Sequence, residues 1–107
     1  MAMSASPITR ERVEERLRAV EREIRALGVA RLALFGSVLR GSARTDSDVD
    51  LLVQFVPGGK TFERFVQLCE LLEEHLGQRV EVVTTESLSP FIGPRILADA
   101  QDVLRAA

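Results

Sequence analysis

Two short apolar runs with a polar stretch between them constrain the fold of this chain more than any other part of its sequence. Residues 29–35 read VARLALF, residues 48–55 read DVDLLVQF, and residues 36–47 between them read GSVLRGSARTDS. Short apolar runs bounded by Gly, Ser and Asp are typical of buried strands. The sequence therefore predicts two strands joined by a polar connection, which is the kind of segment where binding and catalytic residues gather.

Length and composition narrow the class of protein. With 107 residues, of which 46% are hydrophobic and 28% charged, we expect a single globular domain over residues 1–107. No run approaches the roughly 18 apolar residues of a membrane span, and the first ten residues lack the apolar core of a signal peptide, so a cytoplasmic protein is expected. A net charge of −2 gives no general attraction to nucleic acid or to a membrane. Any phosphate chemistry would then be local and metal-assisted.

The amino-terminal segment predicts one charged helix over residues 10–27, with Thr9 as its N-cap. Its apolar positions recur at spacings of three and four and comprise Val13, Leu17, Val20, Ile24 and Leu27. The stripe suits packing on the domain's own sheet, and it also suits a partner helix.

A second helix is predicted over residues 62–76, between Thr61 and Gly77. Its expected buried stripe comprises Phe62, Phe65, Val66, Cys69, Leu72 and Leu76.

The remaining segments predict a third strand at residues 79–84 and short helical turns, interrupted by Pro90 and Pro94, over residues 86–100. Residues 101–107 form a last short strand or a frayed end. This order predicts an α/β (α+β) fold in which a small mixed β-sheet is covered by helices.

The second apolar run begins with two acids. On a strand, Asp48 and Asp50 project to the same face with Cα atoms about 6 to 7 Å apart, while Val49 and Leu51 face the core. Two carboxylates so close repel each other unless a cation lies between them, and carboxylate oxygens are ligands that Mg²⁺ prefers. The pair predicts a metal-binding edge.

The end of the first run supplies groups that bind phosphate. At Gly36 the backbone can approach a ligand closely, Ser37 adds a hydroxyl, and Arg40 can add a charge-assisted contact. Each feature alone is common in ordinary turns. Together with the acids they predict a phosphate cradle beside a metal edge.

The whole stretch resembles the minimal nucleotidyltransferase (MNT) domains of the polymerase-β-like nucleotidyltransferase superfamily. The residues that carry the resemblance are Phe35, Gly36, Ser37, Arg40, Gly41, Ser47, Asp48, Asp50 and Leu51. It extends from the first predicted helix through residues 79–88, and so covers most of the chain.

The resemblance implies a polymerase-β-like fold and a site for two Mg²⁺ ions held by Asp48, Asp50 and a third carboxylate. That third position reads Val-Asp-Leu-Val-Thr in the family and VEVVT here, so Glu81 replaces the expected aspartate. Glu81 would then bind metal or take the proton of the acceptor hydroxyl. The alternative without a catalytic role is that Glu81 is a solvent-exposed residue on a strand.

For the nucleotide, the resemblance implies that Gly36, Ser37, Arg40 and Ser47 bind it and that Gly36, Ser37 and Arg40 hold its β and γ phosphates. Lys60, Arg79 and Arg95 are further cations able to bind phosphate, but the sequence does not place them there.

The function implied is transfer of AMP from ATP, or of a nucleotide from another NTP, to a hydroxyl of a partner protein. MNT proteins are commonly antitoxins paired with helical HEPN-type toxins, and this chain would be such an antitoxin. Two alternatives stay open: an inactive antitoxin that neutralises by binding alone, and an NTP-binding regulatory subunit. A nucleic-acid partner is not expected, and a homo-oligomer is left open.

Overall fold

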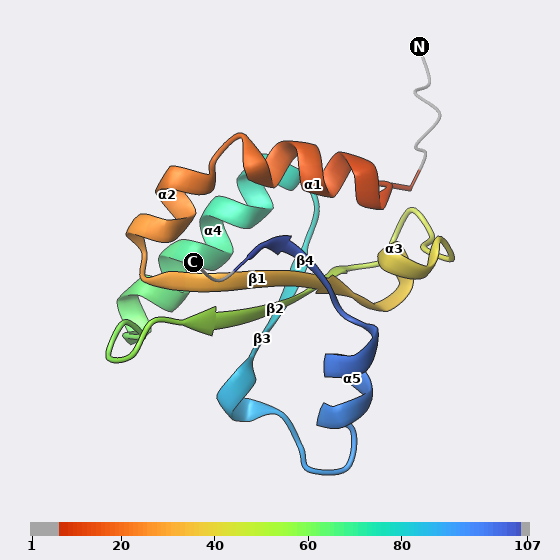
Figure 1. The fold of residues 1–107 in the computed structure, drawn as a ribbon. Coiled ribbons are helices and arrows are strands. Elements are labelled where there is room, and N and C mark those ends of the chain that lie inside the picture. The colour runs from red at the N-terminus through yellow and green to blue at the C-terminus, as the bar shows by residue number, and fades with distance from the viewer. Residues whose placement is uncertain (1–6, 106–107) are drawn as a thin grey trace.

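A four-stranded mixed sheet lies at the centre of the computed structural model, which describes residues 7–105 (Figure 1). The strands are β1 (Val29–Phe35), β2 (Val49–Phe55), β3 (Val80–Thr84) and β4 (Gln101–Leu104), in the order β3-β2-β1-β4. Strand β1 is antiparallel to β2 and β4, whereas β2 and β3 run parallel. The predicted mixed sheet is confirmed, and the carboxyl-terminal segment forms a strand; residues 106 and 107 of that prediction lie outside the described part.

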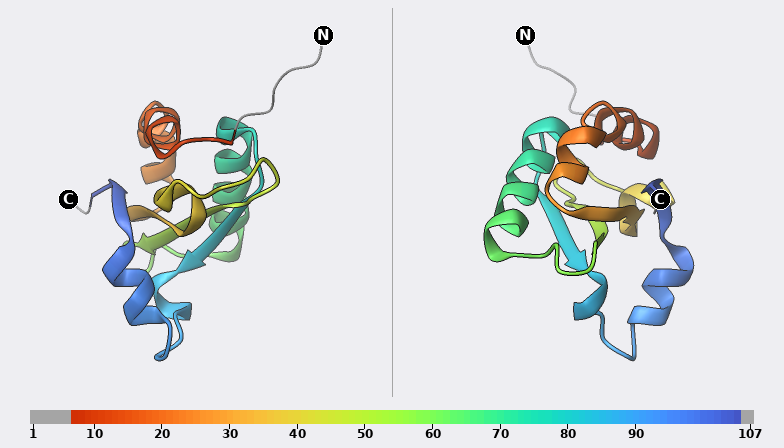
Figure 2. Two further views of the ribbon diagram at one scale, coloured as in Figure 1. Left: turned by 90° about the vertical axis from the view of Figure 1, so that its right-hand side faces the viewer. Right: turned by 60° about the vertical axis from the view of Figure 1, so that its left-hand side comes forward.

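Helices cover the two faces of the sheet unequally. The helices α1 (Arg10–Arg18), α2 (Glu21–Ala26) and α4 (Phe62–Leu76) lie on one face. The short α3 (Gly36–Arg40) follows β1 directly, while a 3-10 turn, η1 (Thr85–Ser87), leads towards α5 (Gly93–Asp99) on the opposite side (Figure 2). On the second face, the segment from η1 to α5 is the main neighbour of the sheet.

The main core lies between the sheet and the helices α1, α2 and α4. Along β2, Leu51 and Val53 are fully buried on the helical side, and Leu52 on the other face is buried as well. The first two pair in register with Leu34 and Leu32 of β1, which are also buried. Asp50 therefore projects to the opposite face, as predicted.

The predicted first helix is wrong in its length, because the chain breaks into α1 and α2 around Ala19 and Val20. Thr9 does cap α1, accepting a hydrogen bond from the Arg12 backbone N–H at 3.2 Å. Before the break α1 contacts α4 and β4, and after it α2 contacts β1. No Gly or Pro marks the break in the sequence, so tertiary packing decides it.

The predicted stripe of the second helix is also partly wrong. Thr61 caps α4 as expected, but the buried positions are Leu68, Leu72 and Leu76, spaced by four residues. Phe62 is 82% exposed, and Val66 is exposed as well. Leu72 and Leu76 are thus confirmed as buried, Phe65 packs against the core while only partly buried, and the first residue of α4 lies outside the core.

Pro94 does not interrupt a helical turn but stands in the first turn of α5, where its missing N–H costs no hydrogen bond. Within residues 7–105, no helix combines the length and the apolar character needed to cross a membrane.

Candidate functional site

One row across the sheet brings the predicted site residues together. Phe35 at the end of β1 pairs with Asp50 on β2, and Asp50 pairs in turn with Glu81 on β3. The β2–β3 pairing is parallel and in register, so both acids lie on the same face of the sheet. The structure thus places Glu81 beside Asp50, although the two are far apart in the sequence.

Gly36 closes one side of this row. It has φ +79°, the left-handed region that favours glycine, and its Cα faces the Asp50 carboxylate. A Cβ there would overlap with Asp50 Oδ2 and would lie 2.8 Å from its Cγ. Only glycine fits between β1 and the acid without displacing the carboxylate.

Asp50 carries the electrostatic imbalance of the site. Its pKa is raised to about 6, most strongly by partial burial and further by the charge of Glu81, by a hydrogen bond with Glu81 that the protonated form makes, and by the charge of Asp48. Arg40 opposes the rise in pKa. Negative charge therefore exceeds positive charge around Asp50.

Asp48 stands just before β2, near enough to Asp50 to raise its pKa, and contacts Arg79. Its Oδ1 accepts a hydrogen bond from Arg79 Nε at 3.4 Å, and its side chain is 36% exposed. Ser47, predicted to bind nucleotide, lies in a local turn, where its hydroxyl accepts a hydrogen bond from the Arg44 backbone N–H at 2.8 Å. Arg79 is thus a neighbour of the acids that sequence reasoning left unplaced.

Ser37 and Arg40 lie on α3, next to Gly36. Ser37 is half-buried, and its carbonyl accepts a hydrogen bond from the Ser42 backbone N–H at 2.9 Å. Arg40 is exposed, near enough to Asp50 to affect its pKa.

The carboxylates of the site are the type of ligand that a hard divalent cation such as Mg²⁺ prefers. Asp50 and Glu81 offer carboxylate oxygens side by side, and the charges of Glu81 and Asp48 contribute to the raised pKa of Asp50, so a cation among them would favour the ionised carboxylates. Within residues 7–105, however, no three His, Cys, Asp or Glu side chains are gathered as a ready metal site.

Two hollows flank the acids. One, of about 310 Å³, lies between α3 and α5 and is lined by Gly36, Arg40 and Arg95 among others. The second, on the side of Asp48 and Arg79, is formed by residues 45–48 and 77–79. Arg95 is therefore brought to the site by α5, and no short-range sequence pattern could have placed it there.

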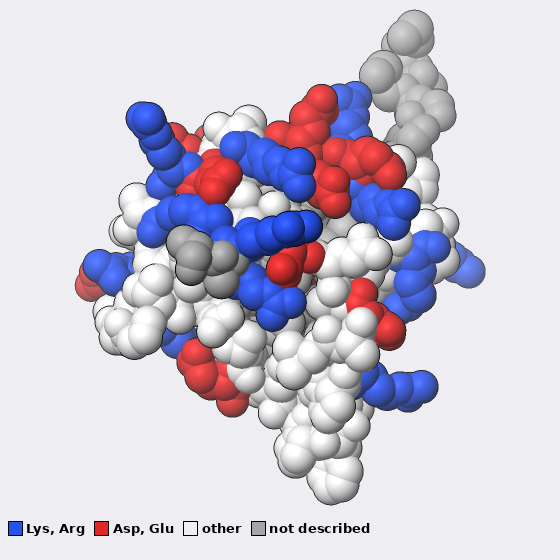
Figure 3. All heavy atoms as spheres, viewed as in Figure 1, with Lys and Arg blue, Asp and Glu red and all other residues white. Residues whose placement is uncertain are grey.

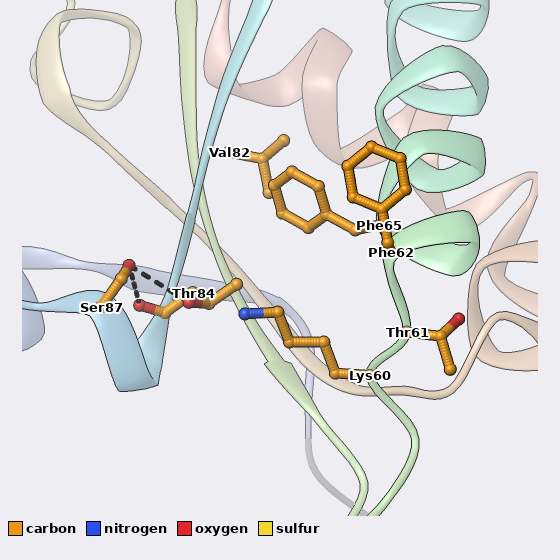
Figure 4. A pocket seen from close by; sticks show the side chains of 7 residues that line it. All are labelled: Lys60, Thr61, Phe62, Phe65, Val82, Thr84 and Ser87. Atoms are coloured by element: carbon orange, nitrogen blue, oxygen red, sulfur yellow. Dashed lines mark hydrogen bonds between the residues drawn. The ribbon is translucent and has the colours of Figure 1, made fainter.

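An apolar groove elsewhere on the molecule is not part of this site (Figure 4). Phe62, Phe65 and Val82 line it at the start of α4, and Lys60 projects across its lower side. Lys60 Nζ lies 3.6 Å from Glu86 Oε2. None of the acids of the candidate site lines this groove.

Known proteins match the chain over most of its length. Residues 13–103 match the family described as "Nucleotidyltransferase domain". The protein adenylyltransferase MntA of Thermococcus cleftensis is 40% identical over 95 residues, which are 86% of this chain and 93% of the relative. A solved minimal nucleotidyltransferase is 38% identical with a TM-score of 0.78, covering 90% of this chain and 97% of that one.

More distant structures share the fold alone. A toxin-antitoxin complex with AMP-PNP contains a chain with 19% identity and a TM-score of 0.68, matched over 87% of this chain and 73% of that one. A complex of a tri-AMPylated Shewanella oneidensis HEPN toxin with an MNT antitoxin gives 15% identity and a TM-score of 0.61, over 88% and 73%. In sequence and in fold, the similarity spans the strands that carry the acidic row.

Proposed function

Because this chain belongs to the nucleotidyltransferase domain family, we propose that it transfers AMP from ATP to a hydroxyl group of a partner protein. The observation that carries the proposal is the row of Phe35, Asp50 and Glu81, closed by Gly36 against the Asp50 carboxylate. The name of the 40% identical relative, a protein adenylyltransferase, supports a protein as acceptor.

In the proposed reaction, the acceptor oxygen forms a bond to the α-phosphorus of ATP. The bond from that phosphorus to the α,β-bridging oxygen breaks, and pyrophosphate leaves with the bonding electrons. Asp48, Asp50 and Glu81 would hold Mg²⁺, two ions in this proposal, whose chemistry is to neutralise the charge on the reacting phosphate oxygens.

The other steps fall to the protein's own groups. Glu81 is exposed beside Asp50, so in our proposal its carboxylate receives the proton that the acceptor hydroxyl loses. The Gly36 backbone and the Ser37 hydroxyl hold phosphate oxygens, and Arg40 adds a charge-assisted contact. Ser47 binds the nucleotide in the same proposal, from the turn that leads into Asp48.

The partner in this proposal is a helical HEPN-type toxin, and the chain is its antitoxin. A protein of the same fold is described as an MNT antitoxin in a complex with an AMPylated HEPN toxin, which supports both the partner and the modification.

The proposal is tested by the intact mass of a HEPN-type partner co-expressed with this chain and incubated with ATP and Mg²⁺. We expect the partner to gain one or more AMP units, and to gain none with the Asp48→Asn variant. Asp48→Asn should keep the fold, because its side chain is partly exposed before the strand begins. A partner whose mass stays unchanged with wild-type protein would contradict the proposal.

A second candidate, an antitoxin that neutralises by binding without catalysis, is favoured by two observations. Glu81 stands where the family has aspartate, and the described residues contain no ready three-ligand metal site. The Glu81→Asp variant separates the candidates: if reach limits the reaction, it raises AMP transfer severalfold while complex formation stays the same. If wild type and Glu81→Asp both bind the partner tightly and neither transfers AMP, the second candidate holds.

A further inference from the structure

The two edges of the sheet differ in how far they are covered. Strand β4 forms one edge, and the Val103 carbonyl near its end accepts a hydrogen bond from Arg18 Nε at 3.5 Å. Just beyond the strand, the Arg105 carbonyl accepts one from Arg25 Nη2 at 2.8 Å. In the view of Figure 3, Lys and Arg side chains gather over α2 and the end of β4. Charged side chains at an edge discourage pairing with a further strand, so the β4 edge is protected.

Strand β3 forms the other edge, and its middle residue directs its backbone groups outward. Across the β2–β3 ladder, the Val49 N–H donates to the Arg79 carbonyl. The next residue, Val80, directs its N–H the other way, to Glu73 Oε2 on α4 at 3.1 Å. Because successive residues of a strand alternate in this respect, Val82 also directs its N–H and carbonyl away from β2. Within residues 7–105 neither group makes a hydrogen bond outside the ladder, so both are available to an added strand.

The apolar groove at the start of α4 follows this open edge. Val82 pairs in register with Leu51, which is fully buried on the helical side, so the Val82 side chain points to the same side. Figure 4 shows the rings of Phe62 and Phe65 beside Val82. The groove that they line has a volume of about 480 Å³. A hollow beside an open strand edge suits a large apolar side chain of a strand that pairs with this edge.

The other face of β3 belongs to the candidate site, because Glu81 lies there beside Asp50. On a strand added to β3, neighbouring residues point to opposite faces of the sheet. One residue of the added strand therefore lies beside Glu81, and the next one enters the groove. Adjacent strands are about 4.8 Å apart, so a hydroxyl beside Glu81 is within reach of its carboxylate. The β3 edge can thus hold an acceptor hydroxyl at the group that receives its proton in the proposed function.

The charges along the β3 edge indicate what kind of segment it binds. The nearby cations Lys60 and Arg79 are paired with other acids. Glu73 and Glu81, in contrast, make no ion pair within the part of the chain that the structure describes. A second copy of this chain, paired through β3, would bring the same carboxylates against them, and like charges across a strand pair repel. A segment that carries Lys or Arg is complementary to them.

We propose that the β3 edge binds an extended, basic segment of the acceptor protein as an added strand. The segment carries the hydroxyl residue beside Glu81 and a large apolar residue next to it, which enters the groove of Phe62 and Phe65. A Lys or Arg of the segment meets Glu73. This inference rests on the proposed function and adds the way in which its protein substrate is held.

The first test compares two exposed phenylalanines in binding a purified HEPN-type partner. Phe62→Ser should weaken the affinity for this partner about tenfold and raise the partner concentration needed for half-maximal AMP transfer by a similar factor. Phe91→Ser is the matched control, because Phe91 is 88% exposed against 82% for Phe62 but does not line the groove. The control should bind the partner as the wild-type protein does.

The second test needs no variant, because it follows amide hydrogen exchange in the wild-type chain with and without the partner. The Val82 N–H should exchange readily in the free chain and become protected in the complex, since the added strand accepts its hydrogen bond. The Val83 N–H, which is directed to β2, should be protected in both states.

Three results would overturn the docking at β3. One is wild-type affinity in Phe62→Ser, and another is a Val82 amide that exchanges equally fast with and without the partner. The third is self-association of the chain that Phe62→Ser abolishes, because the edge would then bind a second copy. Where the wild-type protein still transfers AMP in these cases, the proposed function stands. A wild-type complex in which the partner gains no AMP would instead contradict the proposed function, and with it the acceptor role of the bound segment.

Discussion

Replacing Gly36 with alanine tests how tightly the acidic row is closed. The substitution places a side chain in the left-handed region at φ +79°, which costs about 1 to 2 kcal/mol. It also inserts a Cβ where the Asp50 carboxylate now lies, and an overpacked site costs about 1 to 3 kcal/mol more. We therefore expect the free energy of unfolding to fall by about 2 to 5 kcal/mol in Gly36→Ala.

Gly41 provides a matched control for this substitution. It has φ +75°, but a Cβ there would meet nothing within 4 Å. Gly41→Ala should therefore cost only the conformational part, about 1 to 2 kcal/mol. Urea denaturation of both variants measures the difference, which is the cost of the contact with Asp50.

Activity should separate the two variants further. Asp50 can escape the new methyl group only by turning out of the row, so Gly36→Ala should lose AMP transfer even where it remains folded. Gly41→Ala should retain it. Equal stability and equal transfer in the two variants would refute the reasoning that Gly36 is required by the Asp50 carboxylate.

Two further predictions concern pH and packing. The pKa of Asp50 rises from 3.8 to about 6 on folding, so without Mg²⁺ the folded state gains stability from this group as pH falls through about 6 towards 4. Asp50→Asn should remove that dependence and raise the free energy of unfolding at pH 7.5 by about 1 kcal/mol, a value reduced by solvent screening of the half-buried group. Denaturation of wild type and variant at pH 4.5 and 7.5 measures both effects. An unaltered pH dependence of stability in the variant would contradict the prediction. In α4, Leu72→Ala should lower the free energy of unfolding by about 2 to 5 kcal/mol, because Leu72 is fully buried. Phe62→Ser should change it by less than about 0.5 kcal/mol, because Phe62 is exposed. Comparable losses of stability in the two variants would show that the buried face of α4 is misassigned.

Local sequence patterns were enough to predict the strands and the acidic edge. Alternation along β2 identified Val49 and Leu51 as core residues and placed Asp50 on the other face, because the period of a strand is two. The mixed sheet followed from the order of the elements.

Features that depend on tertiary packing were not predictable in the same way. The break at Ala19 and Val20 carries no Gly or Pro, and it occurs where α1 and α2 turn to different neighbours. Phe62 has the spacing of a core residue yet projects from the first turn of α4, where the core does not follow. A hydrophobic stripe gives the direction of a helix face but not the extent of the surface that it meets.

The candidate site likewise contains residues that the sequence pointed to and one that it could not place. The structure places Gly36 against the Asp50 carboxylate and pairs Asp50 with Glu81, and the roles that the resemblance implied for these residues stay predictions. Arg95 could not be placed, because it joins the site through the path of α5 across the sheet rather than through any spacing along the chain.

The central claim is nucleotidyl transfer, and labelled ATP tests it most directly. Purified wild-type protein is incubated with Mg²⁺, a co-expressed HEPN-type partner, and ATP labelled on either its α or its γ phosphate. The account predicts that the α label, and not the γ label, becomes attached to the partner, and that Asp48→Ala abolishes the transfer while complex formation persists. Transfer of the γ label, or a tight wild-type complex that acquires no label, would contradict it.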